Sequence, residues 1–213
     1  MNLVLFANQL NQLLQAPSKP DIIGCLEGVC DLLRIHTDSS VRLTNHNGDA
    51  VVELLNLQKT IFSQAVYSVS ALIIAEGKDF GSLFLCKNDK PFNETETLAM
   101  NFASSICTIL MQYQHKQDAA DKKRRIKSVR AVINNLSFSE LEAATHAVRA
   151  IDGSEGLLVG GHIADRLGFT RSVVTGALKK LEGAGLIETR SLGMKGTYIR
   201  IIDLLLKDEL GKL

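Results

Sequence analysis

The chain has 213 residues, 46% of them hydrophobic, which suits one large or two small domains with substantial cores. No apolar run approaches the roughly 18 residues of a membrane span, and Met1–Phe6 lacks the basic region of a secretory signal, so we expect a cytoplasmic protein without membrane contact. The formal net charge of +1 hides an asymmetry, because residues 1–115 carry −4 and residues 116–213 carry +5. Phosphate affinity depends on local positive charge, so the near-neutral total does not exclude DNA binding.

Cysteine and histidine bear on metal binding and catalysis. The cysteines lie in apolar runs without CxxC or His-rich spacing, which indicates buried free thiols rather than a metal site: Cys25, Cys30, Cys86 and Cys107. The histidines are scattered, and none lies in a ligand-spaced or nucleophile motif: His36, His46, His115, His146 and His162. We therefore expect no metal, no catalytic residue and no enzymatic activity.

The first 35 residues predict two helices. Apolar residues recur at helical spacing, and Pro17 and Pro20 then interrupt the pattern. The first stripe comprises Leu3, Phe6, Leu10, Leu13 and Leu14, and the second comprises Ile22, Ile23, Leu26, Val29, Cys30 and Leu33.

Two strand pairs follow. Residues 40–44 and 50–55 alternate around Asn47-Gly48, which is a strong hairpin signal. Residues 70–75 and 80–86 form the second pair around a turn at Glu76–Asp79. Helices, hairpins and a closing helix predict an α+β domain that resembles small sensory domains of the GAF or PAS type.

The closing helix is predicted to be long. Asn93 caps it with Glu96 three residues later, and no Pro or Gly stops it between Gln114 and Lys127. Its apolar stripe comprises Leu98, Phe102, Ile106, Ile109, Leu110 and Tyr113, and resumes at Val129, Val132 and Ile133. Whether the 98–113 stripe packs within one chain or between two chains is open. The basic run of Lys122–Arg125 and Lys127 is either a solvated face or a contact to DNA phosphate.

The last 78 residues predict a winged helix-turn-helix, a module that places one helix in the DNA major groove. Ser137 and Ser139 each precede a Glu by three residues, so either can cap the first helix. Its inward positions are Leu141, Ala144, Val148 and Ile151, and the next helix is marked by Leu157, Leu158, Ile163, Ala164 and Leu167. Gly168 then ends that helix in a left-handed conformation.

The following helix is predicted to read DNA. Thr170 is its expected N-cap, with the hydroxyl accepting a backbone N–H. Val174, Ala177, Leu178 and Leu181 supply the buried stripe, while Arg171, Thr175 and Lys179 share one exposed face beside Ser172 and Gly176. Arg171 is suited to a bidentate contact with guanine, and Ser172 and Thr175 to bases or phosphates. The alternative is that Arg171 is an ordinary surface residue.

A wing is predicted after Gly183 and Gly185. Residues 186–190 and 197–202 are its strands, and residues 191–196 are its tip. Lys195, near two glycines, can reach a phosphate or the minor groove, with Arg190 and Arg200 beside it. Solvated hairpin charge is the alternative reading of these three residues.

These blocks resemble the C-terminal domain of the CodY family of transcriptional repressors. The similar segments are residues 136–143, 153–159, 163–168, 170–173, 177–182 and 191–198, nearly without gaps over about 78 residues. The resemblance implies a homodimer that binds A/T-rich palindromic operators in double-stranded DNA and represses metabolic genes. It also implies that Arg171 and Ser172 occupy recognition-helix positions important for operator binding.

The N-terminal half resembles the GAF domain of this family in plan. The family carries most of its branched-chain amino acid pocket between the two strand pairs, an interval that is shortened here to about Asn56–Val69. Arg42 lies in the strand comparable to the one whose Arg binds the ligand carboxylate. A branched-chain amino acid or GTP is the effector that the resemblance implies, although residues 76–82 do not form a Walker A motif.

The sequence thus predicts a truncated GAF-like sensor and dimerisation domain at residues 1–112, a helical linker at 113–135 and a winged helix-turn-helix at 136–213. The predicted function is that of a sequence-specific transcriptional regulator. The alternative is an effector-binding or dimerisation module whose helix-turn-helix contacts protein.

Overall fold

The computed structural model describes residues 2–15, 21–57 and 60–212. It divides into two compact units, Met1–Asp118 and Ala119–Leu213, termed here the N-terminal and C-terminal units. The predicted interruption at Pro17 and Pro20 lies outside the described residues. Within those residues, no helix combines the length and apolarity needed to cross a membrane.

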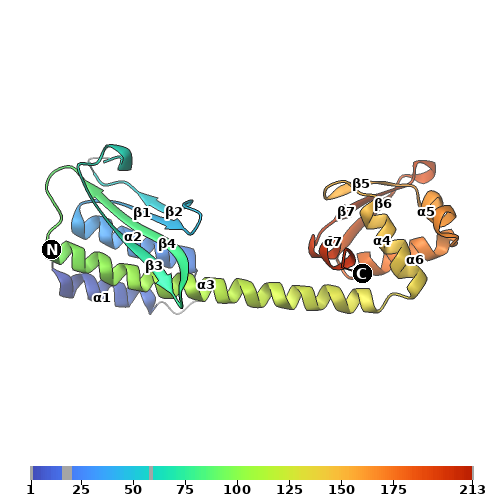
Figure 1. Ribbon diagram of the computed structural model, residues 1–213, viewed down its shortest axis with the longest axis horizontal. Helices are drawn as coiled ribbons and strands as arrows, with labels where there is room; N and C mark the ends of the chain where they lie inside the picture. The colour runs from blue at the N-terminus through green and yellow to red at the C-terminus, as the bar shows by residue number, and fades with distance from the viewer. Residues whose placement is uncertain (1, 16–20, 58–59, 213) are drawn as a thin grey trace. The chain divides into compact units, whose positions relative to one another are not determined.

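The N-terminal unit is an antiparallel sheet covered by helices (Figure 1). Helices α1 (Leu3–Leu14) and α2 (Ile22–Thr37) precede the strands, as predicted. The strands are β1 (Ser40–Asn45), β2 (Ala50–Leu54), β3 (Tyr67–Ala75) and β4 (Lys78–Lys87), in the order β2-β1-β4-β3. A short 3-10 helix, η1 (Phe62–Gln64), lies between the two hairpins.

The hairpin turns are shorter than the sequence suggested. Only Glu76 (φ 52°) and Gly77 (φ 73°) connect β3 to β4, because Lys78 and Asp79 already pair with β3. Gly81 (φ 140°) lies where the β3–β4 register shifts, and a Cβ on it would be 1.8 Å from the carbonyl oxygen of Thr44. Glycine is therefore required for the close approach of β1 and β4.

The core of this unit lies on one face of the sheet. Inward strand residues are fully buried against α1, α2 and the first half of α3: Val41, Leu43, Ile73, Leu83 and Leu85. The alternate residues, including Arg42, Ser82 and Phe84, lie on the opposite face, which lines a cavity. The sheet therefore separates a helix-covered core from an open face.

Helix α3 (Glu94–Asn134) is continuous over 41 residues and crosses the division between the units. The predicted capping box is confirmed, because the Asn93 backbone N–H donates to Glu96 Oε2 and the Glu96 N–H donates to Asn93 Oδ1, both at 2.9 Å. The predicted apolar stripe is only in part the buried face. The residues packed into the core are Ala99, Met100, Ala103 and Cys107, whereas Leu98, Phe102, Ile109 and Tyr113 are exposed.

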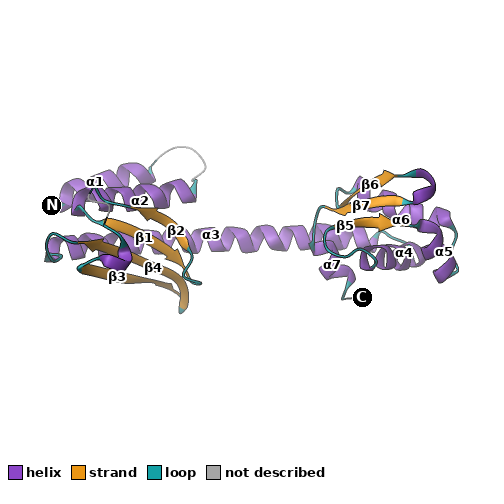
Figure 2. Ribbon diagram, turned by 90° about the horizontal axis from the view of Figure 1, so that it is seen from above, coloured by secondary structure: helices purple, strands orange, loops and turns teal. Residues whose placement is uncertain are grey.

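The C-terminal unit follows the winged helix-turn-helix plan. After the end of α3 come α4 (Phe138–Arg149), β5 (Glu155–Leu158), α5 (Gly160–Leu167), α6 (Arg171–Gly183), β6 (Ile187–Ser191), η2 (Gly193–Lys195), β7 (Thr197–Ile201) and α7 (Leu205–Leu210). Figure 2 shows the three strands side by side, in the order β5-β7-β6. Ser137 is the N-cap of α4, in a capping box with Glu140.

One predicted element of this unit is wrong. Leu157 and Leu158 belong to strand β5, not to the helix that follows it. Leu158 pairs with Thr197 of β7, and its side chain is buried. Pairing with a strand about 40 residues away determines this segment, and its local apolar pattern does not distinguish strand from helix.

The cysteines are free thiols, and Cys30, Cys86 and Cys107 are buried. A hydrogen bond with Cys107, together with burial, raises the pKa of the Cys30 thiol, which therefore stays protonated. Among the described residues, no cluster of His, Cys, Asp or Glu could hold a metal ion.

Candidate nucleic-acid interface

The turn between α5 and α6 brings the helix-turn-helix residues together. Gly168 (φ 69°) ends α5 in the left-handed conformation, as predicted, and its N–H donates to the Ala164 carbonyl. Phe169 N–H donates to the same carbonyl at 2.9 Å. Three residues therefore suffice to redirect the chain into α6.

Thr170 occupies the N-cap position of α6, but its hydroxyl does not cap the helix. Its backbone is extended (φ −81°, ψ 153°), and its side chain accepts no backbone N–H. Instead, Thr170 Oγ1 and Ser172 Oγ share a hydrogen bond of 2.7 Å. The neighbouring hydroxyl competes with the backbone, so the predicted cap is wrong, and the two hydroxyls form one exposed polar pair at the start of α6.

Helix α6 presents the predicted face to solvent. Val174, Ala177, Leu178 and Leu181 are buried. The exposed residues are Thr170, Arg171, Ser172, Thr175 and Lys179. The structure therefore places all five predicted contacts of this region on one accessible surface.

Lys180 has a different role from its neighbour Lys179. Its Nζ is 2.7 Å from Glu140 Oε2, which joins α6 to the capping box of α4. Lys180 and the Ser137 backbone N–H lower the pKa of Glu140. This contact orients α6 on α4, whereas Lys179 has no ion pair within the described residues.

The Arg171 guanidinium lies over the first turn of α5. A Cβ on Gly161 would be 3.1 Å from Arg171 Nη2 and 3.3 Å from Nε, so the missing side chain leaves room for the guanidinium. Arg171 is also the first residue of α6. Two helix N-termini and one guanidinium therefore create a positive potential that attracts an anionic partner.

The wing is attached to both β5 and α6. Gly196 (φ 113°) passes so close to β5 that a Cβ would be 2.5 Å from the Leu158 carbonyl oxygen. The Thr189 backbone N–H and hydroxyl both donate to Glu182 Oε1 at 2.8 Å, which ties β6 to α6. Lys195 is exposed at the tip, as the sequence predicted.

One residue of the basic run of α3 forms an ion pair inside the C-terminal unit. Arg125 donates to both carboxylate oxygens of Asp203, at 2.9 and 3.3 Å, a contact that neither predicted alternative for the run included. Arg130, which follows the run, pairs with the buried carboxylate of Glu209. Lys122, Lys123 and Lys127 are exposed and form no ion pair within the described part of the chain.

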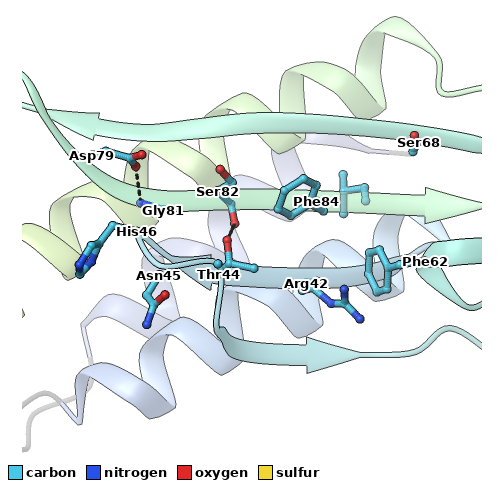
Figure 3. A pocket seen from close by; sticks show the side chains of 12 residues that line it. Arg42, Thr44, Asn45, His46, Phe62, Ser68, Asp79, Gly81, Ser82 and Phe84 are labelled. Carbon is cyan, nitrogen blue, oxygen red and sulfur yellow. Dashed lines mark hydrogen bonds between the residues drawn. The ribbon is translucent and has the colours of Figure 1, made fainter.

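The open face of the N-terminal sheet holds a cavity of about 470 Å³. Arg42, the predicted effector contact, lines it and pairs with Glu53 Oε2 at 2.8 Å. Its guanidinium also lies 4.4 Å from the centre of the Phe62 ring. Figure 3 shows Arg42 and Asp79 toward opposite ends of the cavity. Glu53 was not predicted as a partner of Arg42, although the hairpin register places the two residues opposite each other.

Similarity to known proteins is concentrated in the C-terminal unit but is not confined to it. Residues 154–212 match the family model of the CodY helix-turn-helix domain. A "Global transcriptional regulator CodY" of Exiguobacterium sibiricum is 46% identical over 131 residues, which cover 62% of this chain and 51% of that protein. The protein of that name from Clostridium botulinum is 43% identical over 141 residues, covering 66% of this chain and 55% of the relative.

The match with Lysinibacillus sphaericus "Global transcriptional regulator CodY" is longer, at 36% identity over 167 residues, 78% of this chain and 63% of the relative. An alignment of this length exceeds the C-terminal unit and therefore extends into the N-terminal unit. The chain spans between half and two thirds of the length of these relatives.

Proposed function

We propose that the chain is a sequence-specific DNA-binding transcriptional regulator, because residues 154–212 match the family model of the CodY helix-turn-helix domain. The observation that carries the proposal is the exposed face of α6, where Arg171, Ser172, Thr175 and Lys179 lie together on a domain of this type. Such a helix enters the major groove with its N-terminal residues on the base edges.

In the proposed complex, α6 reads the sequence and the wing contacts the backbone. Arg171 contacts guanine O6 and N7, and the Thr170–Ser172 hydroxyl pair contacts a base or phosphate. Lys195 contacts a phosphate. Each phosphate that a cation neutralises releases about one condensed counterion from the DNA. We propose an A/T-rich palindromic operator bound by a homodimer, since two-fold symmetry in the protein is matched by palindromy in the site.

For the N-terminal unit we propose a GAF-type sensor. The support is the antiparallel sheet with helices on one face and a cavity on the other. Arg42 near one end of that cavity and Asp79 near the other suit the carboxylate and ammonium groups of a free amino acid. A carboxylate ligand would have to compete with Glu53 for Arg42, so we expect weak binding, with isoleucine and valine as first candidates.

The test is a fluorescence-anisotropy titration of an A/T-rich palindromic duplex, with and without isoleucine, at two salt concentrations. The proposal expects selective, salt-sensitive binding, a loss of about 1–3 kcal/mol in Arg171→Ala and relaxed sequence preference. Arg149→Ala, an exposed arginine on α4, is the control and should bind normally.

Equal binding of every duplex would reject sequence-specific regulation and favour a helix-turn-helix that contacts protein. Binding that is selective but indifferent to isoleucine and valine would reject only the amino acid sensor. The two parts of the proposal therefore fail separately.

A further inference from the structure

The cavity on the open face of the N-terminal sheet carries different charges at its two ends. At one end, Arg42 Nε donates to Glu53 Oε2 at 2.8 Å, and the guanidinium lies 4.4 Å from the centre of the Phe62 ring. A carboxylate therefore already balances the charge of Arg42. Asp79 lies toward the other end and forms no ion pair within the described part of the chain. One positive side chain meets two negative ones, so the three groups carry a net charge of −1.

The carboxylate of Asp79 is held in place by the backbone. Its Oδ1 accepts the Gly81 N–H at 2.8 Å, and no other hydrogen bond to this carboxylate occurs among the described residues. The neighbouring Lys78 does not line the cavity, because successive side chains of a strand point to opposite faces. Asn45 lines the same end and donates to Asp49 Oδ2 at 3.1 Å, which adds a second carboxylate close by. This end of the cavity therefore has a negative potential.

From this charge distribution we infer that the cavity binds the ammonium group of a small organic amine, and that an amine without a carboxylate binds more tightly than the corresponding amino acid. The inference rests on the proposed sensor and defines the chemical class of its ligand. Figure 3 shows Ser82 between Asp79 and Phe84. The Ser82 hydroxyl can accept an ammonium N–H, and the Phe84 ring offers an apolar surface whose face attracts cations. An amine can use these three residues without disturbing Arg42.

A ligand carboxylate finds no unpaired cation among the residues that line this cavity. It would have to displace Glu53 from Arg42 or lie beside it, and two carboxylates at one guanidinium repel each other. Arg42 and Glu53 are partly exposed, with 36% and 39% of their side-chain surface accessible. Solvent therefore screens this repulsion, and the penalty corresponds to about a fivefold change in affinity. Valine and isobutylamine form the matched pair of ligands, because they differ only in the carboxylate.

The test is a titration of the isotope-labelled full chain followed by amide NMR, with valine, isobutylamine or sodium chloride at matched ionic strength. Isobutylamine should bind about fivefold more tightly than valine, with the largest shifts at the Gly81 and Ser82 amides. Asp79→Asn keeps the acceptor for the Gly81 N–H but removes the charge, so amine binding should weaken about fivefold or more. The control is Asp89→Asn, which changes an exposed carboxylate outside the cavity lining. It should bind the amine normally.

Glu53→Gln reverses the expected preference. The substitution removes the competing carboxylate from Arg42, so valine should bind about fivefold more tightly and the advantage of isobutylamine should disappear. The matched control is Asp31→Asn, which breaks an ion pair with Arg34 on α2. This control should keep the preference for the amine, because Asp31 does not line the cavity.

Four results would overturn the inference. Tighter binding of valine than of isobutylamine by the wild type would reject the amine and leave the proposed amino acid sensor standing. Amine binding that persists unchanged in Asp79→Asn would place the ammonium elsewhere, and equal shifts with sodium chloride would reduce the effect to ionic screening. Amides that respond to neither ligand would reject the inference and the sensor together. Duplex titration tests DNA binding separately in every case.

Discussion

The buried ion pair at the start of α3 gives a sharp test of how the N-terminal unit is held together. Lys87 is fully buried at the end of β4, and its Nζ is 2.8 Å from Glu96 Oε1. The ammonium also lies 3.5 Å from the Thr37 carbonyl oxygen and 4.5 Å from the centre of the Phe92 ring. The pair therefore connects the C-terminal end of α2, strand β4 and the N-terminus of α3. We predict that Lys87→Met is strongly destabilising.

The magnitude follows from the charge that the substitution leaves behind. Met preserves most of the side-chain volume, but Glu96 would keep a buried carboxylate whose remaining donor is the Asn93 N–H. Breaking one side of a buried pair costs about 3–5 kcal/mol. With a urea m-value of roughly 2 kcal/mol/M, the unfolding midpoint should fall by about 2 M. Adding Glu96→Gln removes the stranded charge, so the double variant should recover at least half of the loss.

Urea unfolding read by pulsed hydrogen–deuterium exchange and mass spectrometry is the suitable assay, because peptides of the two units are followed separately. The control is Lys116→Met, which removes an exposed ion pair with Glu76 and should change stability by less than about 0.5 kcal/mol. A loss below about 1 kcal/mol in Lys87→Met would contradict the reasoning. So would a double variant as unstable as the sum of the two single variants, since it would show that the groups do not interact.

Further predictions concern the C-terminal unit. Gly196→Ala should destabilise the wing by about 2 kcal/mol or more, because it combines a positive φ with a backbone clash; Gly153→Ala, with a positive φ but open space, should cost about 1 kcal/mol by chemical denaturation. Lys195→Ala should reduce the slope of log affinity against log salt by about 1 for every duplex; an unchanged slope would remove this residue from the backbone contacts. The folded-state pKa of Glu140 is lowered, so its stabilisation is present above the ordinary carboxyl pKa and disappears as pH falls through the lowered value. Thermal unfolding across that window should therefore show a smaller pH dependence in Glu140→Gln than in the wild type, and equal slopes would argue against the Lys180 contact.

Local sequence signals predicted the elements whose causes are local. Asn47-Gly48 marks the β1–β2 hairpin, Asn93 and Glu96 cap α3, and Gly168 ends α5, because each depends on the conformation or hydrogen bonds of a few adjacent residues. The exposed face of α6 could be predicted for the same reason, since helical spacing alone separates the buried residues of this helix from its exposed ones.

Three of the failures depend on distant partners, whereas the cap missed at Thr170 reflects competition from the nearby Ser172 hydroxyl. Strand β5 exists because it pairs with β7, which local apolarity cannot show. The first half of α3 has apolar residues on two opposite faces. Helical periodicity alone does not show that the face with Ala99 and Ala103 is the one that packs against the sheet. The pairing of Arg42 with Glu53 becomes visible only once the hairpin register is known.

The ion pairs indicate which residues carry the excess positive charge of the C-terminal half. Paired cations in the C-terminal unit, such as Arg125, Arg130 and Lys180, are held by carboxylates, and this pairing restricts where the excess positive charge resides. The excess therefore falls on exposed cations such as Lys179 and Lys195. Paired surface charges contribute little to long-range attraction, because their fields largely cancel. The salt dependence of DNA binding should thus belong to the unpaired cations of the helix-turn-helix face, of the wing and of α3 (Lys122, Lys123 and Lys127). The paired Arg125 and Arg130 of α3 act instead on the stability of the unit.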